Sequence, residues 1–276
     1  MAQFVVTDST AYLSPEFIKQ NKIEVVPLNV NLQGEIFKEG MGRTNHDYFN
    51  LLRQQPIFPQ TSQPSAGDFL KVFAQLKSGD EALVIVISAG ISGTDQSALT
   101  ARKMLNREDI KIEVIDSRFT SLGLAFQVMK AYELRDRGNK LEDIKEDLIN
   151  MQKQMSFFFL VDDLEYLARG GRIGHWSKHL GSILQIKPVL HLKDGKIEVF
   201  QKIRTRSKAI NLIAEEFSKR AGQVEKVAIA HVDSWELVPE IRDKIAGIYK
   251  GPLEIYEVGP VIGSHVGPGT VGLCFY

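Results

Sequence analysis

The sequence has 276 residues, 43% hydrophobic and 25% charged, and its 34 basic residues balance 34 acidic ones, which argues against nucleic-acid binding over the whole surface. A single cysteine, Cys274, excludes an intrachain disulfide and an all-cysteine metal cluster. No apolar run approaches the roughly 20 residues of a membrane span, and the N-terminus lacks the basic segment of a signal peptide, so we expect a cytoplasmic protein without membrane insertion.

The first half of the chain alternates between strand and helix patterns. Apolar runs predict strands, and capping residues followed by amphipathic stretches predict helices. We expect strands at Phe4–Val6, Leu83–Ile87 and Ile112–Ile115, an extended stretch at Ile23–Leu32, helices that begin after Ser14, Thr44 and Ser65, and further helices at Leu122–Arg135 and Leu141–Gln154. This alternation is typical of a mainly parallel sheet covered by helices on both faces, so residues 1–154 are predicted to form an α/β domain.

The second half of the chain mixes a hairpin with helices. Leu190–Val199 is predicted to be a hairpin that turns at Asp194-Gly195, because an Asp-Gly pair suits a tight two-residue turn. The other expected elements are strands at Ser156–Val161, Val227–His231, Leu253–Val258 and Val271–Phe275, and helices at 207–220 and 236–249. Residues 155–276 are therefore predicted to form a second, α+β domain.

The stretch Ala82–Thr94 combines a buried strand, a turn with two glycines and the start of a helix. Free N–H groups at a helix N-terminus favour an anion, and Gly90 and Gly93 allow the backbone to approach a ligand. Ser92 adds a hydroxyl group. The stretch lacks the motif of a phosphate-binding loop, and Thr94 replaces the second glycine of a serine nucleophile elbow. A tight turn with a helix-capping hydroxyl explains the pattern equally well.

Histidines are the next candidates. His175 and His179 have the spacing of two metal ligands on one helix face, but no nearby acid or thiol completes a site, so no metal is expected. His265 lies within Gly263–Thr270, which is so rich in glycine that we expect a loop. A histidine between glycines is placed to donate a hydrogen bond to a ligand, and a purely structural loop is an equal alternative.

Basic residues gather at two places. Arg169 and Arg172 flank the flexible pair Gly170-Gly171. The second group alternates at strand spacing, so its members are expected to share one face; they are Lys202, Arg204, Arg206 and Lys208. This face is either a solvated edge strand protected by charge or a docking surface for an acidic partner.

Several segments together resemble one known family. They are Thr7-Asp8-Ser9-Thr10-Ala11, Thr61-Ser62-Gln63-Pro64-Ser65, Ile91-Ser92-Gly93-Thr94 followed by Ser97-Ala98, Leu167 through Gly170-Gly171-Arg172-Ile173, and His265–Gly272. Each motif is weak alone, but their order and spacing across essentially the whole chain are similar to the DegV family. Members of that family are fatty-acid-binding proteins that serve as the acyl-carrying subunit of bacterial fatty acid kinase. The resemblance implies two α/β domains with the ligand between them.

The resemblance also implies roles for individual residues. Thr61 and Ser92 match the hydroxyls that hold the fatty-acid carboxylate, and Gly93 would supply a backbone N–H group. His265 matches the histidine at the carboxylate end, and Arg169 matches the cation that supports it. Arg172 would lie near the partner surface, for which Lys202, Arg204 and Arg206 are further candidates.

A carrier of this kind is expected to need no cofactor and not to be an enzyme itself. It binds one long-chain fatty acid in an apolar tunnel and presents the carboxylate to a separate kinase. The catalytic subunit of that kinase uses ATP to form the acyl phosphate.

Two other functions are compatible with the residues. The first is a hydrolase in which Ser92 is the nucleophile, His265 the base, and Asp8 or Asp116 the residue that orients the base. The incomplete nucleophile elbow argues against it. The second is an interaction module that binds an acidic partner through Lys202–Lys208 with no small ligand.

Overall fold

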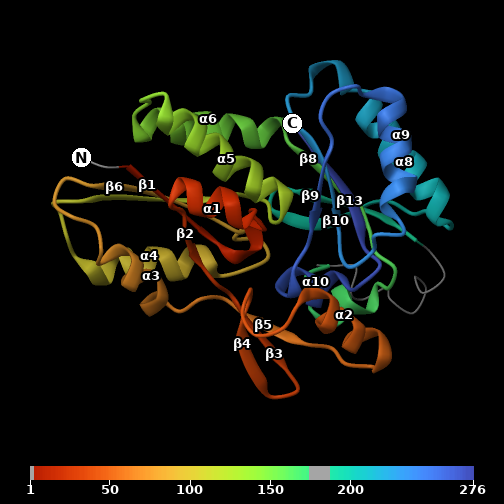
Figure 1. Ribbon diagram of the computed structural model, residues 1–276, viewed down its shortest axis with the longest axis horizontal. Helices are drawn as coiled ribbons and strands as arrows, with labels where there is room; N and C mark the ends of the chain where they lie inside the picture. Colours follow the sequence, from red (N-terminus) through yellow and green to blue (C-terminus); the bar gives the residue numbers. More distant parts are fainter. Residues whose placement is uncertain (1–2, 174–186) are drawn as a thin grey trace.

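The computed structural model describes residues 3–173 and 187–276, which form two α/β units side by side and a small sheet beneath them (Figure 1). The first unit has a parallel sheet with the strand order β2-β1-β6-β7. Its strands are β1 (Gln3–Asp8), β2 (Glu24–Val26), β6 (Glu81–Val86) and β7 (Lys111–Asp116). The parallel α/β architecture predicted for the first half of the chain is confirmed.

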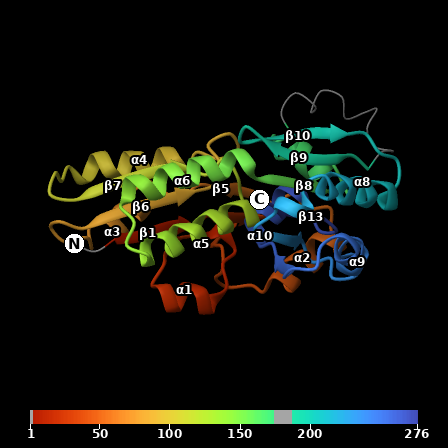
Figure 2. The same cartoon turned by 90° about the horizontal axis from the view of Figure 1, so that it is seen from above.

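Helices cover both faces of this parallel sheet because its strands are apolar on both sides. Helices α3 (Ala66–Phe73) and α4 (Thr94–Leu105) pack on one face, where Phe69 and Phe73 are fully buried. Helix α5 (Leu122–Asp136) packs on the other face, together with α1 (Pro15–Asn21) and α6 (Leu141–Gln154). Figure 1 shows α5 and α6 above the strands and α3 and α4 below them, and in Figure 2, seen from above, α5 and α6 lie over the strands.

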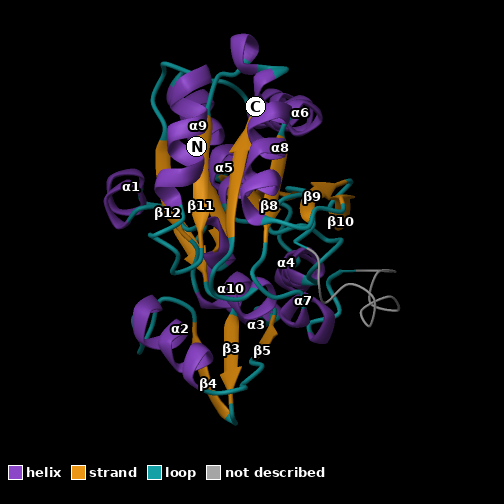
Figure 3. Ribbon diagram, turned by 90° about the vertical axis from the view of Figure 1, so that its right-hand side faces the viewer, coloured by secondary structure: helices purple, strands orange, loops and turns teal. Residues whose placement is uncertain are grey.

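The second unit has a six-stranded sheet with the order β10-β9-β8-β13-β11-β12, antiparallel except between β11 and β12. Its strands are β8 (Ser156–Leu160), β9 (Val189–Lys193), β10 (Lys196–Gln201), β11 (Val227–His231), β12 (Glu254–Glu257) and β13 (Val271–Phe275). Helices α8 (Arg206–Ser218) and α9 (Val238–Ile248) cover one face (Figure 3). The predicted hairpin is confirmed, with positive φ at Asp194 and Gly195.

The third sheet, which we call the arm, consists of β3 (Asn29–Leu32), β4 (Glu35–Lys38) and β5 (Gln60–Ser62), all antiparallel. Helix α2 (Asn45–Gln54) lies between β4 and β5 in the chain, and we count it as part of the arm. The arm follows β2 because Pro27, which has no N–H group, separates the two strands that we expected as one extended stretch.

The arm packs against the second unit although it lies within the first half of the sequence. Its partner is α10 (Pro260–Val266), and α7 (Glu165–Arg169) packs beside α10. The Tyr48 hydroxyl group lies 2.6 Å from Ser264 Oγ, and the Phe49 ring fills the space beside Gly263, where a Cβ atom has no room. Among the described residues, no helix is both long and apolar enough to cross a membrane.

One buried carboxylate links the arm to both units. Glu39, 7% exposed, accepts hydrogen bonds from Ser9 Oγ at 2.6 Å, Tyr12 Oη at 3.0 Å and the Val261 N–H group at 2.7 Å. Burial raises the pKa of Glu39 from 4.5 to about 7, and the three hydrogen bonds offset only part of this desolvation.

The raised pKa predicts a pH dependence of stability. The folded protein binds a proton at Glu39 that the unfolded chain releases, so the free energy of unfolding should fall as pH rises from about 4.5 to about 7. The loss should be at most about 3 kcal/mol. Urea unfolding across this interval measures it, with Glu39→Gln as the control in which this part of the slope disappears. Equal slopes in the two proteins would contradict the prediction.

Candidate functional site

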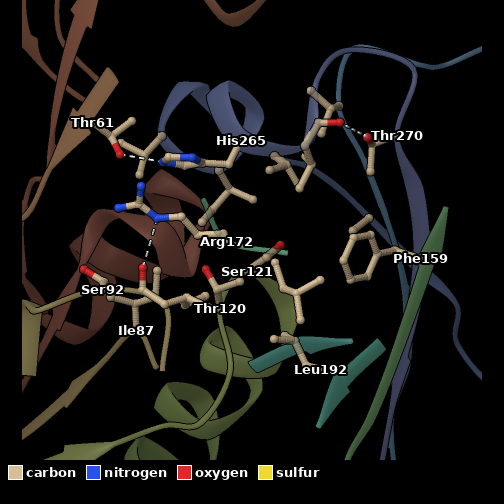
Figure 4. Close-up of a pocket in the computed structure, with 18 of the residues that line it drawn as sticks. Thr61, Ile87, Ser92, Thr120, Ser121, Phe159, Arg172, Leu192, His265 and Thr270 are labelled. Atoms are coloured by element: carbon tan, nitrogen blue, oxygen red, sulfur yellow. Dashed lines mark hydrogen bonds between the residues drawn. The ribbon is translucent and has the colours of Figure 1, made fainter. Parts of the chain in front are cut away.

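A cavity of about 350 Å³ lies where the two units and the arm meet, and this volume is within the roughly 300–1,000 Å³ of small-molecule sites (Figure 4). Most of its wall is apolar. The apolar residues include Ile87 after β6, Phe157 and Phe159 on β8, Leu192 on β9, Val232 after β11 and Val261 on α10. The cavity is therefore suited to hydrocarbon along most of its surface.

The predicted carboxylate ligands gather at one end of this cavity, and they come from separate parts of the chain. Thr61 lies on β5 of the arm, Ser92 and Gly93 precede α4, and His265 lies on α10. Thr61 Oγ1 and His265 Nε2 are 2.6 Å apart, and Ser92 Oγ is 2.9 Å from Thr94 Oγ1. Thr61, Ser92, Gly93 and His265 are thus the predicted carboxylate ligands that the structure brings to one cavity.

The turn before α4 supplies the backbone part of this polar end. Gly93 occupies the N-cap position, with no side chain to bond the first N–H groups of the 12-residue helix. The helix therefore favours an anion beside Gly93. Gly90 has a different role from the one we expected. A Cβ atom on Gly90 would collide with the carbonyl oxygen of Gly195, so this glycine permits contact between the two units rather than with a ligand.

Two carboxylates hold the same turn in place. Asp8 accepts a hydrogen bond from the Ile87 N–H group at 2.6 Å, and Asp116 accepts one from the Ala89 N–H group at 3.1 Å. Asp8 is fully buried, and burial raises its pKa to about 6. Asp8 and Asp116, at the carboxyl ends of β1 and β7, thus position the turn at the sheet edge.

His265 lies in a helix, and our expectation of a glycine-rich loop is wrong. Pro260 occupies the first turn of α10, where its missing N–H group costs no hydrogen bond, and the helix ends at Gly267 with φ of +79°. Gly263, inside this short helix, serves close packing against Phe49. Gly170 approaches the same histidine, since a Cβ atom there would lie 2.5 Å from His265 Nδ1.

The His265 ring is neutral over most of the pH range. Burial, and secondarily the positive charge of Arg172, lowers the pKa of His265 from 6.5 to about 4. Its Nδ1 atom is buried and has no hydrogen-bond partner among the described residues. The ring therefore contributes one neutral hydrogen-bonding nitrogen, Nε2, at the polar end.

The two arginines occupy different places from those we expected. Arg172 lines the cavity, where its Nε donates to Ile91 O at 3.4 Å and its Nη1 donates to Gly170 O at 2.5 Å. Arg169 does not line the cavity. Its guanidinium group pairs with Glu165 and stacks 3.9 Å from the centre of the Phe58 ring. The helical turn of α7 directs Arg169 outward, and the chain reverses after Gly170, which brings Arg172 inward.

The basic group at 202–208 does not share the face of one strand. Strand β10 ends at Gln201, and Thr205 is the N-cap of α8, so the strand spacing is interrupted. Arg206 is half-buried and bonds Asp162 Oδ1 at 2.9 Å, which gives it a structural role. Lys202 and Arg204 are exposed in the connection between β10 and α8.

The residues of the hydrolase alternative do not form a catalytic triad. His265 Nε2 contacts Thr61 and not Ser92, whose hydroxyl contacts Thr94. The carboxylates of Asp8 and Asp116 bond backbone N–H groups of the turn before α4 instead of the histidine. His175 and His179 lie outside the described residues, and the described residues contain no group of three or more possible metal ligands.

Sequence reasoning missed most of the cavity wall, which includes the hydroxyls of Thr120, Ser121 and Thr270. The wall has no motif, because any apolar residue of suitable size can form it. A signal existed for part of it: in the run Ser156-Phe157-Phe158-Phe159, the strand period of two places Phe157 and Phe159 on the same face.

Comparisons with known proteins agree with this architecture. A family model described as "Uncharacterised protein, DegV family" matches residues 4–276. This chain belongs to the DegV family. Protein DegV of Bacillus subtilis is 36% identical over an alignment of 277 positions that covers 98% of each chain.

Two solved DegV structures are similar to this one over its full length. A DegV family protein from Thermus thermophilus, described by its fatty acid binding, has 34% identity and a TM-score of 0.91 and is covered over 99% of its chain. DegV from Bacillus subtilis, described as a fatty acid binding protein, has 35% identity, a TM-score of 0.89 and 99% coverage of its chain. The α/β fold expected for this family is confirmed.

The neutral state of His265 can be tested directly by NMR. The ¹⁵N chemical shifts of its ring should remain those of a neutral imidazole until the pH approaches about 4. In Arg172→Gln the pKa should rise, because a nearby positive charge is removed, but should stay below 6.5 because burial is the larger cause. A midpoint at or above 6.5 in the unsubstituted protein would show that the site is more hydrated than the structure indicates.

Proposed function

We propose that this DegV family protein binds one long-chain fatty acid, with the hydrocarbon tail in the cavity and the carboxylate at its polar end. The observation that carries the proposal is a largely apolar cavity whose polar end combines Thr61, Ser92 and His265 with the N-terminus of α4. The fatty acid binding described for the Thermus thermophilus and Bacillus subtilis proteins supports the same ligand class.

The polar end fits a carboxylate. Removing a carboxylate from water costs several kcal/mol unless hydrogen bonds replace those of the solvent. Two hydroxyl groups, the backbone beside Gly93 and the guanidinium group of Arg172 are available to offset this cost. The resemblance assigns the role of supporting cation to Arg169. Because Arg172, and not Arg169, lines the cavity, we propose this role for Arg172.

The tail provides most of the affinity in this proposal. Each CH₂ group that leaves water contributes about 0.8 kcal/mol, so a long acyl chain contributes on the order of 10 kcal/mol before the entropic cost of binding. The apolar wall therefore sets affinity and chain-length preference. The polar end sets orientation and excludes ligands that lack the acid group.

The finer proposal is that the protein presents the bound carboxylate to a separate kinase. A carboxylate oxygen attacks the γ-phosphorus of ATP, ADP leaves, and the product is the acyl phosphate. In this role the protein is a carrier and not the catalyst, and it needs no cofactor of its own. The exposed residues Ser62 and Gln63, which follow Thr61 and line the cavity, support access from outside.

Removing the carboxylate ligands should weaken binding without unfolding the protein. Ser92→Ala and Thr61→Val should each raise the Kd for palmitate about tenfold, because a hydrogen bond to a charged group contributes roughly 1.5–3 kcal/mol. Isothermal titration calorimetry measures the change, and circular dichroism checks the fold. Ser207→Ala, at an exposed serine outside the cavity, is the matched control. Unchanged palmitate affinity in both site variants would exclude this carboxylate site.

The kinase proposal makes a separate prediction about Lys202 and Arg204. Charge reversal of both residues to glutamate should leave the palmitate Kd unchanged but lower the rate of acyl phosphate formation by a DegV-coupled fatty acid kinase at least tenfold, because an acidic docking face would be repelled. A matched control reverses Lys103, a basic residue on the exposed side of α4. An unchanged rate would show that Lys202 and Arg204 do not contact the kinase, and it would not affect the proposal of fatty acid binding.

A further inference from the structure

Two buried hydroxyl groups in the cavity have no hydrogen-bond partner among the described residues. Thr120 and Ser121 line the cavity and are 6% and 2% exposed, and neither Thr120 Oγ1 nor Ser121 Oγ makes a hydrogen bond within the part of the chain that the structure describes. Thr270 shows the usual situation. Its hydroxyl also lies at the cavity, but it donates to carbonyl oxygens of Val266 and Gly267 at 2.9 Å. Buried hydroxyl groups are normally bonded, so the unbonded pair calls for a ligand.

The two hydroxyls lie at the N-terminus of α5, a helix of 15 residues. Ser121 occupies the N-cap position, yet its side chain makes no capping hydrogen bond. The carbonyl groups of both residues are already engaged, Thr120 O by the Gly123 N–H group at 3.2 Å and Ser121 O by the Ala125 N–H group at 2.9 Å. The Ser121 N–H group bonds Thr10 O at 2.9 Å, which fixes the backbone at a φ of +50°. The hydroxyls alone are left to face the cavity.

Ser121 lies farther along the cavity than the proposed carboxylate ligands. Figure 4 shows Ser121 away from Thr61, toward Phe159 and Leu192, with Thr120 between Ser121 and Ser92. The apolar residues near them are those assigned to the tail. A ligand whose carboxylate is at Ser92 would therefore pass the pair with its hydrocarbon chain.

We propose that Thr120 and Ser121 bind an oxygen substituent on the acyl chain, so that the ligand class includes long-chain fatty acids with a mid-chain hydroxyl or keto group. This inference rests on the proposed function. An unsubstituted chain would leave both hydroxyls without partners, whereas a chain oxygen accepts from them, and the positive end of α5 favours it. A site with buried hydrogen-bonding groups discriminates against the analogue that lacks the matching group.

The test compares ligands of equal length. Octadecanoic acid and its monohydroxy derivatives, with the hydroxyl near the acid group, in the middle or near the methyl end, are titrated calorimetrically into the full-length protein. The mid-chain derivative should bind about tenfold tighter than the other derivatives, as expected for one or two additional hydrogen bonds. The preference should disappear in the double variant Thr120→Val with Ser121→Ala.

The matched control is Thr270→Val, which makes the same chemical change at a cavity residue whose hydroxyl is already bonded within the chain. Thr270→Val should preserve the ratio between the affinity for the mid-chain derivative and the affinities for the other derivatives, even if it lowers all of them. Ser121→Gly removes the same hydroxyl and suits the positive φ, so it replaces Ser121→Ala if the latter disturbs folding.

The outcomes separate the two proposals. If neither octadecanoic acid nor any of its derivatives binds, the proposed function fails. If octadecanoic acid binds but no derivative is preferred, or if the preference survives in the double variant, the inference about Thr120 and Ser121 is overturned and fatty acid binding stands. Preference for a derivative substituted near the acid group also overturns it, because that oxygen would lie beside the carboxylate ligands.

Discussion

The buried carboxylate of Glu39 is the interaction on which the arrangement of the three parts of the molecule depends. It lies at the end of the arm and accepts hydrogen bonds from the first unit through Ser9 and Tyr12 and from the second unit through Val261. A buried polar group is stable only when its partners are all in place. The three parts must therefore reach their native positions together, and the cavity is the space that this arrangement encloses.

The site follows from that arrangement because no single unit contains it. The arm contributes Thr61, the first unit contributes Ser92 and Gly93, and the second unit contributes His265 and most of the apolar wall. Strand β11 illustrates the division within the second unit: Ala230 faces the cavity side, whereas Ile229 packs under α8 and α9. The same strand thus serves the cavity and a separate core at once.

The sequence predicted most of the fold and the members of the polar end, but not their surroundings. Strand–helix alternation and capping residues are local signals, so β6, α4 and the β9–β10 hairpin could be located from short patterns. Thr61, Ser92 and His265 were identifiable through family motifs. The helix around His265 was not predicted because its glycines suggested a loop. In the folded chain, Gly263 makes room for the Phe49 ring and Gly267 ends α10.

The other wrong predictions concern residues whose side-chain direction depends on a turn in the backbone. Arg169 and Arg172 are separated by two glycines, and sequence alone does not say which of them faces inward. The spacing of Lys202, Arg204 and Arg206 suggested a strand, but a helix cap at Thr205 overrides it. Thr120 and Ser121 belong to no motif that the sequence shows. They stand out only because their buried hydroxyl groups make no hydrogen bond with the described residues.

The packing of the arm on α10 also has a consequence for biosynthesis. Tyr48 and Ser264, which form a buried contact, are 216 residues apart in the chain. Contacts between such distant residues form late, because the intervening chain must first be ordered. On the ribosome Tyr48 emerges 216 residues before Ser264. The buried aromatic side chains of the arm therefore lack their native cover until α10 has been synthesised, and this makes the nascent chain a natural client for chaperones that shield apolar surface.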